Sequence, residues 1–303
     1  MGFWLINQRV DTEMTGRPPG PLTPRRRLAT LASMATPNEI RGLLRLDHLA
    51  VIEFSGADAT EFLNGQLSND VAALALGGQQ LTSYSSPKGR VVAILTLARE
   101  DERLLGALPA ELAGIVLERL RKYVLRAKVS LRLATELAVF GSTVDPARVA
   151  ILPATGTAAG SGSAAGDAWR HTQIAAGRAQ VYASTTEQFV AQMLNLDLVD
   201  GINFRKGCYT GQEIIARTQN LGRIKRRMLR FVVPTAAALA VGDTVELGEF
   251  GPGMVVELTA AVDGERELLA VVHLEPEVRA RPDERSIVVS ARELALPYAV
   301  RGR

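Results

Sequence analysis

The most informative stretch of this chain is Lys206–Glu213, which reads KGCYTGQE. Thr210 and Glu213 have the spacing of a capping box, in which each side chain accepts a hydrogen bond from the backbone N–H of the other residue. Apolar residues recur at helical spacing immediately afterwards, and Gly201–Phe204 immediately before reads as an extended segment. The pattern therefore predicts an extended segment, a glycine-containing turn and a helix that begins at Thr210.

Cys208, the only cysteine of the chain, lies just ahead of this predicted helix start. A helix N-terminus favours negative charge, and Arg205 and Lys206 add formal positive charge nearby. Such a thiol should ionise more readily than a free one and should be reactive. Gly207 and Gly211 would let the backbone turn sharply and let a ligand approach. The alternative is a small hydrophobic side chain buried in a core.

Composition limits the class of protein. A chain of 303 residues is expected to form two or three domains, and 47% hydrophobic with 22% charged residues is typical of a soluble globular protein. No run approaches the ~20 apolar residues that a membrane span needs. A single cysteine forms no intrachain disulfide, which fits a reducing cytoplasm, and it cannot hold a metal cluster alone.

Residues 49–135 follow the element order of a ferredoxin-like domain. Ser86–Gly89 has the proline and glycine of a tight turn between two strands. The elements expected in order are a strand at Leu49–Phe54, a helix at Asp58–Val71, strands at Leu81–Ser85 and Arg90–Arg99, a helix at Glu111–Arg121 and a strand at Lys128–Leu133.

The flanking regions differ in composition. Residues 1–36 are rich in arginine and proline and are expected to be disordered, with Met34 as an alternative start and a targeting peptide as an alternative reading. Thr155–Gly166 has the Gly, Ala and Ser content of a flexible loop. After Arg226, short alternating runs predict a small β-barrel or sandwich with strands at Met228–Val233, Thr244–Leu247, Gly253–Leu258, Leu268–His273 and Ile287–Ser290.

No metal site is expected. His48, His171 and His273 are the only histidines, and none pairs with another at the spacing of metal ligands. We expect each of them at the surface or in a hydrogen bond.

The Lys206–Glu213 stretch resembles the signature of the YgfZ family, folate-binding relatives of the glycine-cleavage aminomethyltransferase GcvT. The resemblance runs from about Leu43 to the C-terminus. Other segments that fit it in order are Gly56–Ala59, Phe62–Val71, Ser86–Arg90, Tyr123–Val129, Gln192–Leu196 and Gly201–Arg205.

This resemblance implies an α+β fold with a GcvT/YgfZ-like arrangement of three domains. Residues 49–135 would form the ferredoxin-like domain. Residues 37–48 together with 136–224 would form a central folate-binding domain that carries the cysteine motif. Residues 225–303 would form a C-terminal β-barrel.

The resemblance also implies a function. The protein would be a cytoplasmic accessory factor that binds tetrahydrofolate, or a one-carbon derivative, and supports iron–sulfur cluster assembly or repair, and so indirectly tRNA-thiolation enzymes. Its partners would be folate and iron–sulfur proteins or assembly factors, with no membrane and no direct nucleic-acid contact. The implied reactive group is Cys208 with Lys206, Tyr209, Gln212 and Glu213. The implied folate-binding residues are Trp169, Asp70, Lys88, Arg90 and Arg217.

Several alternatives stay open. Trp169 could stack on a pterin or pack in a core. The cations Arg223, Lys225, Arg226, Arg227 and Arg230 could attract a folate glutamate tail or simply line a solvated strand edge.

The class of activity is also open. One alternative function is that of an enzyme, a folate-dependent one-carbon transferase. The other is that of a docking protein that carries out no folate chemistry. Where GcvT carries its acidic pair, the match places Ala93 and Ile94, which cannot exchange a proton. This argues against aminomethyl transfer.

Overall fold

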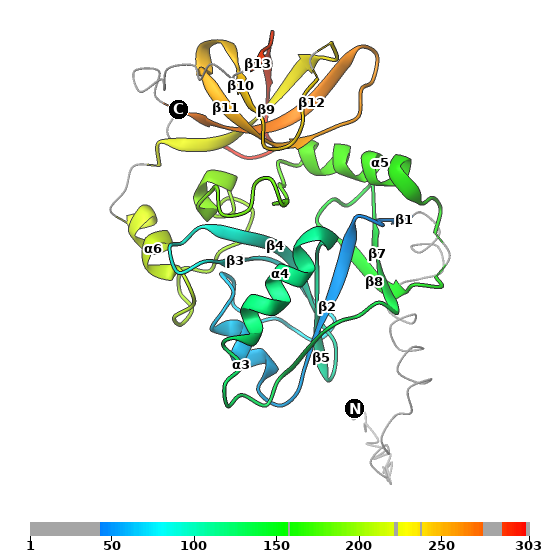
Figure 1. Cartoon of the computed structure of the whole chain (residues 1–303), viewed down its shortest axis with the longest axis vertical. Coiled ribbons are helices and arrows are strands. Elements are labelled where there is room, and N and C mark those ends of the chain that lie inside the picture. The colour runs from blue at the N-terminus through cyan, green and yellow to red at the C-terminus, as the bar shows by residue number, and fades with distance from the viewer. Residues whose placement is uncertain (1–42, 157, 221–223, 237, 275–286, 301–303) are drawn as a thin grey trace, which may run out of the picture. The chain divides into compact units, whose positions relative to one another are not determined.

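The computed structural model describes residues 43–300, apart from 157, 221–223, 237 and 275–286. All of them belong to the unit that extends from Pro37 to Arg303. The disorder predicted for residues 1–36 and the position of Arg223 lie outside the described residues. The described part contains three β-sheets and the helices that pack on them (Figure 1).

The first sheet has five antiparallel strands in the order β3-β4-β5-β2-β6. Helix α4 crosses it, and short helix α3 lies beside it (Figure 1). Its elements are β2 (Leu49–Ser55), α3 (Ala59–Asn64), β3 (Gln79–Ser85), β4 (Val91–Arg99), β5 (Arg103–Pro109), α4 (Ala110–Arg121) and β6 (Ser130–Leu133).

Two sequence predictions for this region were wrong in detail. Strand β5 was missed because its side chains form a buried run rather than an alternating one. Strand β5 lies in the middle of the sheet, between β4 and β2. When the edge strand β3 is left out, the order β4-β5-β2-β6 is that of a ferredoxin-like sheet. Helix α3 ends at Asn64 and not at Val71, because the backbone of Ser68 turns to bond the carbonyl of Ser83.

A second sheet of three antiparallel strands precedes helix α5 in the chain. It contains β1 (Leu44–Arg45), β7 (Leu137–Gly141) and β8 (Val149–Pro153). Helix α5 spans Gly162–Ala175, so part of the stretch expected to be a flexible loop is helical. The side chain of Trp169 on this helix is buried, and this burial anchors the helix despite its many small residues.

The third sheet is formed by the C-terminal strands, in the order β13-β10-β11-β12-β9-β14. Strands β10 and β13 are parallel and the other pairs are antiparallel. Because β13 and β14 do not pair with each other in the described residues, the closed barrel that we expected is not found there. The elements are β9 (Arg226–Pro234), β10 (Thr244–Glu246), the 3-10 turn η2 (Gly248–Phe250), β11 (Pro252–Leu258), β12 (Glu265–His273), β13 (Ile287–Val288) and β14 (Arg292–Leu294).

Between the second and third sheets along the chain lie the 3-10 turn η1 (Ala191–Leu194) and helix α6 (Gln212–Asn220). One continuous hydrophobic core includes side chains of the five-stranded sheet, η1, α6 and strands β9, β11 and β12. The cysteine segment is therefore built onto a shared core. Of the described helices, none combines the length and apolar character needed to cross a lipid bilayer.

Strand β9 carries most of the basic run but is not a sheet edge, because it pairs with both β12 and β14. Arg227 is 1% exposed and forms a two-pronged ion pair with Asp197, at 2.6 and 2.8 Å. Arg230 pairs with Glu267 at 2.6 Å. The alternative of a solvated strand edge does not hold for β9, where Arg227 and Arg230 are fixed in ion pairs.

Candidate functional site around Cys208

The turn that carries Cys208 differs from the predicted capping box. Helix α6 begins at Gln212, two residues later than expected. The Thr210 hydroxyl lies 3.1 Å from Gln66 Oε1, and its backbone N–H donates to the carbonyl of Gly65. Thr210 thus fastens the turn to the end of α3 instead of capping α6, while Cys208 itself is exposed.

Two glycines bring the hairpin between β3 and β4 against this turn. Gly89 and Gly211 both have positive φ, 69° and 81°. A Cβ on Gly211 would lie 2.6 Å from the Ser86 carbonyl oxygen and 3.1 Å from the Gly89 Cα. A Cβ on Gly89 would lie 2.6 Å from that of Ile214 in α6. Only residues without side chains allow this approach.

The tip of that hairpin is the tight turn predicted from the sequence. The Gly89 N–H donates to the Ser86 carbonyl at 2.8 Å. Lys88 is exposed at the tip. Arg90 is half-buried and donates from Nη1 to the Gln188 carbonyl at 2.8 Å. The structure therefore brings these two cations to the segment that carries Cys208.

Lys206 does not point at the thiol. Its ammonium group donates to the carbonyls of Asn64 and Leu67, just past the end of α3, and lies 4.9 Å from the centre of the Tyr209 ring. Burial lowers the pKa of Lys206 to about 8, and the nearby Asp70 carboxylate acts in the opposite direction. Burial also raises the pKa of Tyr209 to about 12. Lys206 and Tyr209 are therefore buried side chains that hold the turn against the end of α3.

Asp70 accepts hydrogen bonds from the N–H groups of Ala72 and Ala73, both at 3.1 Å, which fixes its carboxylate in a turn. Three further predicted residues lie on α6. Glu213 and Arg217 are exposed, and Gln212 is half-buried. Cys208, Glu213 and Arg217 are thus the members of the predicted set on this segment that reach solvent most freely.

Gln192 connects η1 to α6, which the sequence did not suggest. It is fully buried; its Nε2 donates to the Ile215 carbonyl at 2.7 Å, and its own carbonyl accepts from Arg227 at 2.8 Å. Its Oε1 has no partner. Asn195, with φ of 57°, donates to the Met228 carbonyl and so connects the same turn to β9.

Other buried polar atoms near the hairpin also lack partners: Ser85 Oγ, Ser86 Oγ and Arg226 Nε. Burial and the neighbouring Arg90 lower the pKa of Arg226, so the two guanidinium groups are close enough to repel each other. Unpaired buried polar groups are costly to the folded state. Sequence reasoning missed the two serines and Gln192; the one available signal was polar residues within apolar strands or turns.

Trp169 lies elsewhere. It is 4% exposed, packs in the core that includes Leu46, and its ring lies 5.6 Å from that of His48. A Cβ on Gly141 would be 2.4 Å from the indole, so the ring is covered on that side. The structure supports core packing for Trp169 and leaves no open face for stacking on a pterin.

His171 is exposed, whereas His48 and His273 are half-buried. Burial lowers the pKa of His48 to about 4. In the described residues, no three His, Cys, Asp or Glu side chains are grouped so that they could hold a metal ion. Ala93 and Ile94 are fully buried in β4. That position in the hairpin strand therefore offers no acid.

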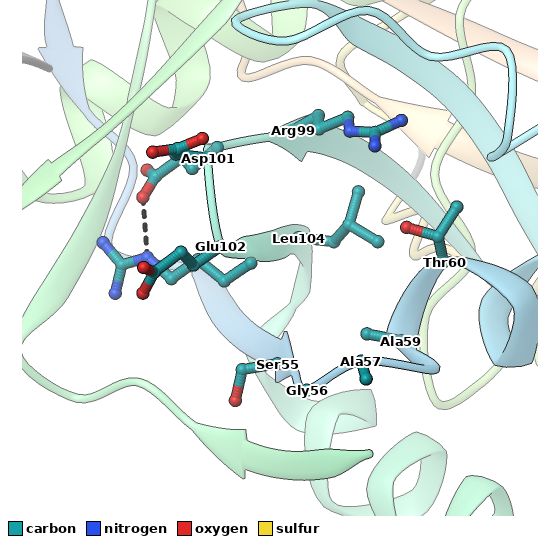
Figure 2. A pocket seen from close by; sticks show the side chains of 11 residues that line it. Ser55, Gly56, Ala57, Ala59, Thr60, Arg99, Asp101, Glu102 and Leu104 are labelled. Carbon is teal, nitrogen blue, oxygen red and sulfur yellow. Dashed lines mark hydrogen bonds and ion pairs between the residues drawn. The ribbon is translucent and has the colours of Figure 1, made fainter. Parts of the chain in front are cut away.

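Surface cavities of the described residues include one beside the cysteine segment and one at the far end of β4. One of about 310 Å³ lies beside the cysteine segment and is lined by Asn69, Asp200, Ile202, Asn203, Phe204 and Arg205. Another of about 480 Å³ is lined by residues on both sides of the β4–β5 turn and by the start of α3 (Figure 2). The second is at the opposite end of β4 from the hairpin that contacts Gly211.

The fold matches that of a solved aminomethyltransferase. The glycine cleavage system aminomethyltransferase T of Bartonella henselae superposes with a TM-score of 0.60 at 16% identity, covering 78% of this chain and 80% of that one. The chain thus has a GcvT-like fold of mixed α and β structure. No protein-family model matches it.

Proteins of similar sequence define the family more closely than the fold does. An uncharacterized protein of Haemophilus influenzae is 32% identical over 221 residues, 67% of this chain and 78% of that protein. The tRNA-modifying protein YgfZ of Klebsiella pneumoniae is 26% identical over 309 residues, 85% of this chain and 93% of that one. The YgfZ of an Enterobacter species is 28% identical over 247 residues, 68% and 76% of the two chains. The chain belongs to the YgfZ family.

Proposed function

We propose that this protein binds tetrahydrofolate, or a one-carbon derivative, and supports iron–sulfur cluster assembly or repair in the cytoplasm, with Cys208 as its reactive thiol. The observation that supports the proposal is the contact between Gly211, in the segment of the exposed Cys208, and the tip of the hairpin that carries Lys88 and Arg90. The relatives named as tRNA-modifying proteins support an indirect role in tRNA thiolation, through enzymes that carry such clusters.

The residues near the hairpin fit a folate. A folate offers hydrogen-bond donors and acceptors on its pterin and carboxylates on its glutamate tail. Arg90 with Arg226 would meet a carboxylate of that tail. A carboxylate between these guanidinium groups would also relieve their mutual repulsion. We assign Trp169 no role in the proposed folate site.

The apolar pair in β4 argues against the transferase alternative. Ala93 and Ile94 carry no proton to exchange and are sealed from solvent. The likeness to an aminomethyltransferase at 16% identity concerns the fold alone. We therefore propose binding and not turnover of the folate.

A cluster would have to be shared. One thiolate cannot hold an iron–sulfur cluster, which typically needs about four such ligands. Because Cys208 is exposed on a turn, a partner protein can reach it. The proposed partners are therefore iron–sulfur proteins or their assembly factors, and the central domain proposed for residues 37–48 and 136–224 would present the thiol to them.

Calorimetric titration with tetrahydrofolate tests the ligand. We expect binding by the wild type, weaker binding by Arg90→Ala and by Lys88→Ala, and unchanged binding by Lys122→Ala, an exposed cation on another loop. Folate recovered afterwards should be unaltered. Absence of binding to folded protein would refute the proposal, and steady release of a one-carbon unit would favour the transferase.

A second measurement tests the thiol. In cells that lack the gene, Cys208→Ala and Cys208→Ser should fail to restore thiolated tRNA, measured by mass spectrometry of digested tRNA. Gly207→Ala is the matched control, since a Cβ there meets nothing within 4 Å. Both cysteine variants should bind tetrahydrofolate as the wild type does, which separates loss of the thiol from loss of the ligand. Full restoration by Cys208→Ala would exclude a reactive role.

A further inference from the structure

The cavity of about 310 Å³ beside the cysteine segment is lined by polar groups that the fold does not use. They are the Asp200 carboxylate, the Asn203 side-chain nitrogen and the Arg205 guanidinium group, which have no hydrogen-bond or ion-pair partner in the described part of the chain. Phe204, which also lines the cavity, is 40% exposed. One small cavity therefore combines an accessible aromatic ring with three polar groups that are available to a ligand.

The lining is held in place by hydrogen bonds that involve none of these three groups. The Asn69 side-chain amide donates to the carbonyls of Leu81 at 2.8 Å and Asp200 at 2.7 Å. Asp200 has a φ of 55°, a left-handed backbone conformation that is costly for most residues. The Asn203 side-chain oxygen accepts from the Arg205 N–H at 2.8 Å. Unfavourable backbone fixed by its surroundings is typical of functional sites, and a preformed lining loses little entropy when a ligand binds.

The three polar groups restrict the chemistry of a ligand. An ionised carboxylate only accepts hydrogen bonds, whereas a guanidinium group and an amide nitrogen only donate them. A simple anion would meet the negative charge of Asp200, and a simple cation would meet the positive charge of Arg205. Because Phe204 offers a flat apolar surface, the set favours an uncharged planar ring with donors on one side and an acceptor on the other.

The amino-oxopyrimidine edge shared by pterins and guanine has this pattern. Its ring N–H and the adjacent amino group can donate side by side to the two oxygens of the Asp200 carboxylate, an arrangement that is both strong and specific. Its oxo group can accept from Asn203 or Arg205, and the ring itself can stack on Phe204. All four side chains thus find a counterpart on one ring.

We propose that this cavity binds the pterin ring of the folate, an inference that rests on the folate binding proposed above. A volume of about 310 Å³ is at the lower end of the range for ligand pockets, so it suits the ring and leaves the rest of the folate outside. Arg205 lies three residues before Cys208, and Gly211 lies three residues after it. Six residues span at most about 20 Å of extended chain. Since Gly211 contacts the hairpin of Arg90, the glutamate tail leads from the cavity past the cysteine turn towards Arg90 and Arg226.

Calorimetric titration of the full-length protein with tetrahydrofolate tests the ring site. Asp200→Asn should weaken binding at least tenfold, because an amide puts N–H donors where the carboxylate oxygens accept. The variant should stay folded, since asparagine tolerates positive φ. Asp263→Asn is the matched control: Asp263 is also exposed and has a positive φ, 50°, but lies outside the cavity. Phe204→Leu should weaken binding by about twofold to tenfold, which corresponds to the loss of ring stacking.

Two fragments of the ligand separate the ring from the tail. Tetrahydrobiopterin has the ring without the glutamate; its binding should depend on Asp200 and be unchanged by Arg90→Ala. The fragment p-aminobenzoylglutamate has the tail without the ring; its binding should depend on Arg90 and be unchanged by Asp200→Asn.

The outcomes distinguish this inference from the proposed function. Tetrahydrofolate that binds wild type and Asp200→Asn equally well overturns the ring site and leaves folate binding itself standing. A folded wild type that binds no tetrahydrofolate overturns both. Binding of GMP that Asp200→Asn abolishes, without binding of tetrahydrobiopterin, also overturns the proposal and assigns the cavity to guanine.

Discussion

Gly89 and Gly211 lie back to back, so that a Cβ on Gly211 would come within 3.1 Å of the Gly89 Cα. This contact helps to join the β3–β4 hairpin to the turn that carries Cys208. Both residues also have positive φ. Steric space and backbone conformation therefore require glycine at each position.

Gly211→Ala should accordingly destabilise the protein by more than the ~1–2 kcal/mol of the left-handed backbone alone, because its Cβ also meets the Ser86 carbonyl at 2.6 Å. Urea unfolding measures the change. Gly207 lies four residues before Gly211 in the same turn, and a Cβ there would meet nothing within 4 Å, so Gly207→Ala should stay within about 0.5 kcal/mol of wild type. Equal effects of the two substitutions would contradict the packing described.

The buried pair of Arg227 and Asp197 leads to a second prediction. Removal of one partner leaves an uncompensated buried charge, so Arg227→Met or Asp197→Leu should cost about 3–5 kcal/mol of unfolding free energy. The double variant should be more stable than either single one, since no charge remains unpaired. Strictly additive losses in urea unfolding would show that the pair is not coupled.

The buried carboxyl group of Glu257 should make the free energy of unfolding depend on pH. Burial raises its pKa to about 7, although Arg170 and hydrogen bonds from Tyr182 and the backbone act against this. The folded state therefore holds this proton more tightly than the unfolded state does, and the resulting stability is complete below pH 4.5 and lost as pH rises through 7.

Glu257→Gln removes that titration and keeps the shape of the side chain. The stability of wild type relative to this variant should fall by on the order of 3 kcal/mol between pH 4.5 and 8, measured by urea unfolding at a series of pH values. A constant difference across this range would mean that the carboxyl group does not titrate there. Asp101→Asn, on an exposed turn, is the control and should show little pH dependence.

Trp169→Ala should destabilise the protein by about 3–5 kcal/mol, because its indole is buried in the core of the second sheet and α5. Thermal or urea unfolding measures the loss. If tetrahydrofolate binds, Trp169→Phe should bind it as well as wild type does. A selective loss of folate affinity in a stable Trp169→Phe variant would return this residue to the ligand site.

Local patterns in the sequence were enough to predict much of the fold. The Ser86–Gly89 turn is confirmed, and the strands around it differ from prediction by two residues at most. Strand β5 was missed because burial on both faces removes the alternation that marks a strand. The Gly- and Ala-rich start of α5 looked like a loop because its helical state depends on packing around Trp169, and packing is not visible in local composition.

The sequence singled out the segments of the candidate site but not their contacts. In the structure, Gly211 of the cysteine motif contacts the hairpin that carries Lys88 and Arg90. Thr210 has the spacing of a capping box. Its hydroxyl group instead forms a hydrogen bond with Gln66, which lies 144 residues earlier in the chain. Gln192 and the two hairpin serines gain significance only from burial without partners, a property that requires the folded structure.

The turn around Cys208 is held by residues far away in the sequence. Lys206 bonds the carbonyl of Leu67, the Ser68 hydroxyl bonds that of Gly201, and Thr210 bonds Gly65. On a ribosome, the 64–68 segment is made more than a hundred residues before the thiol is. The turn can therefore close only onto a first sheet that is already in place, and contacts of such long sequence separation form slowly. The nascent chain would therefore order its thiol only after the first sheet has formed.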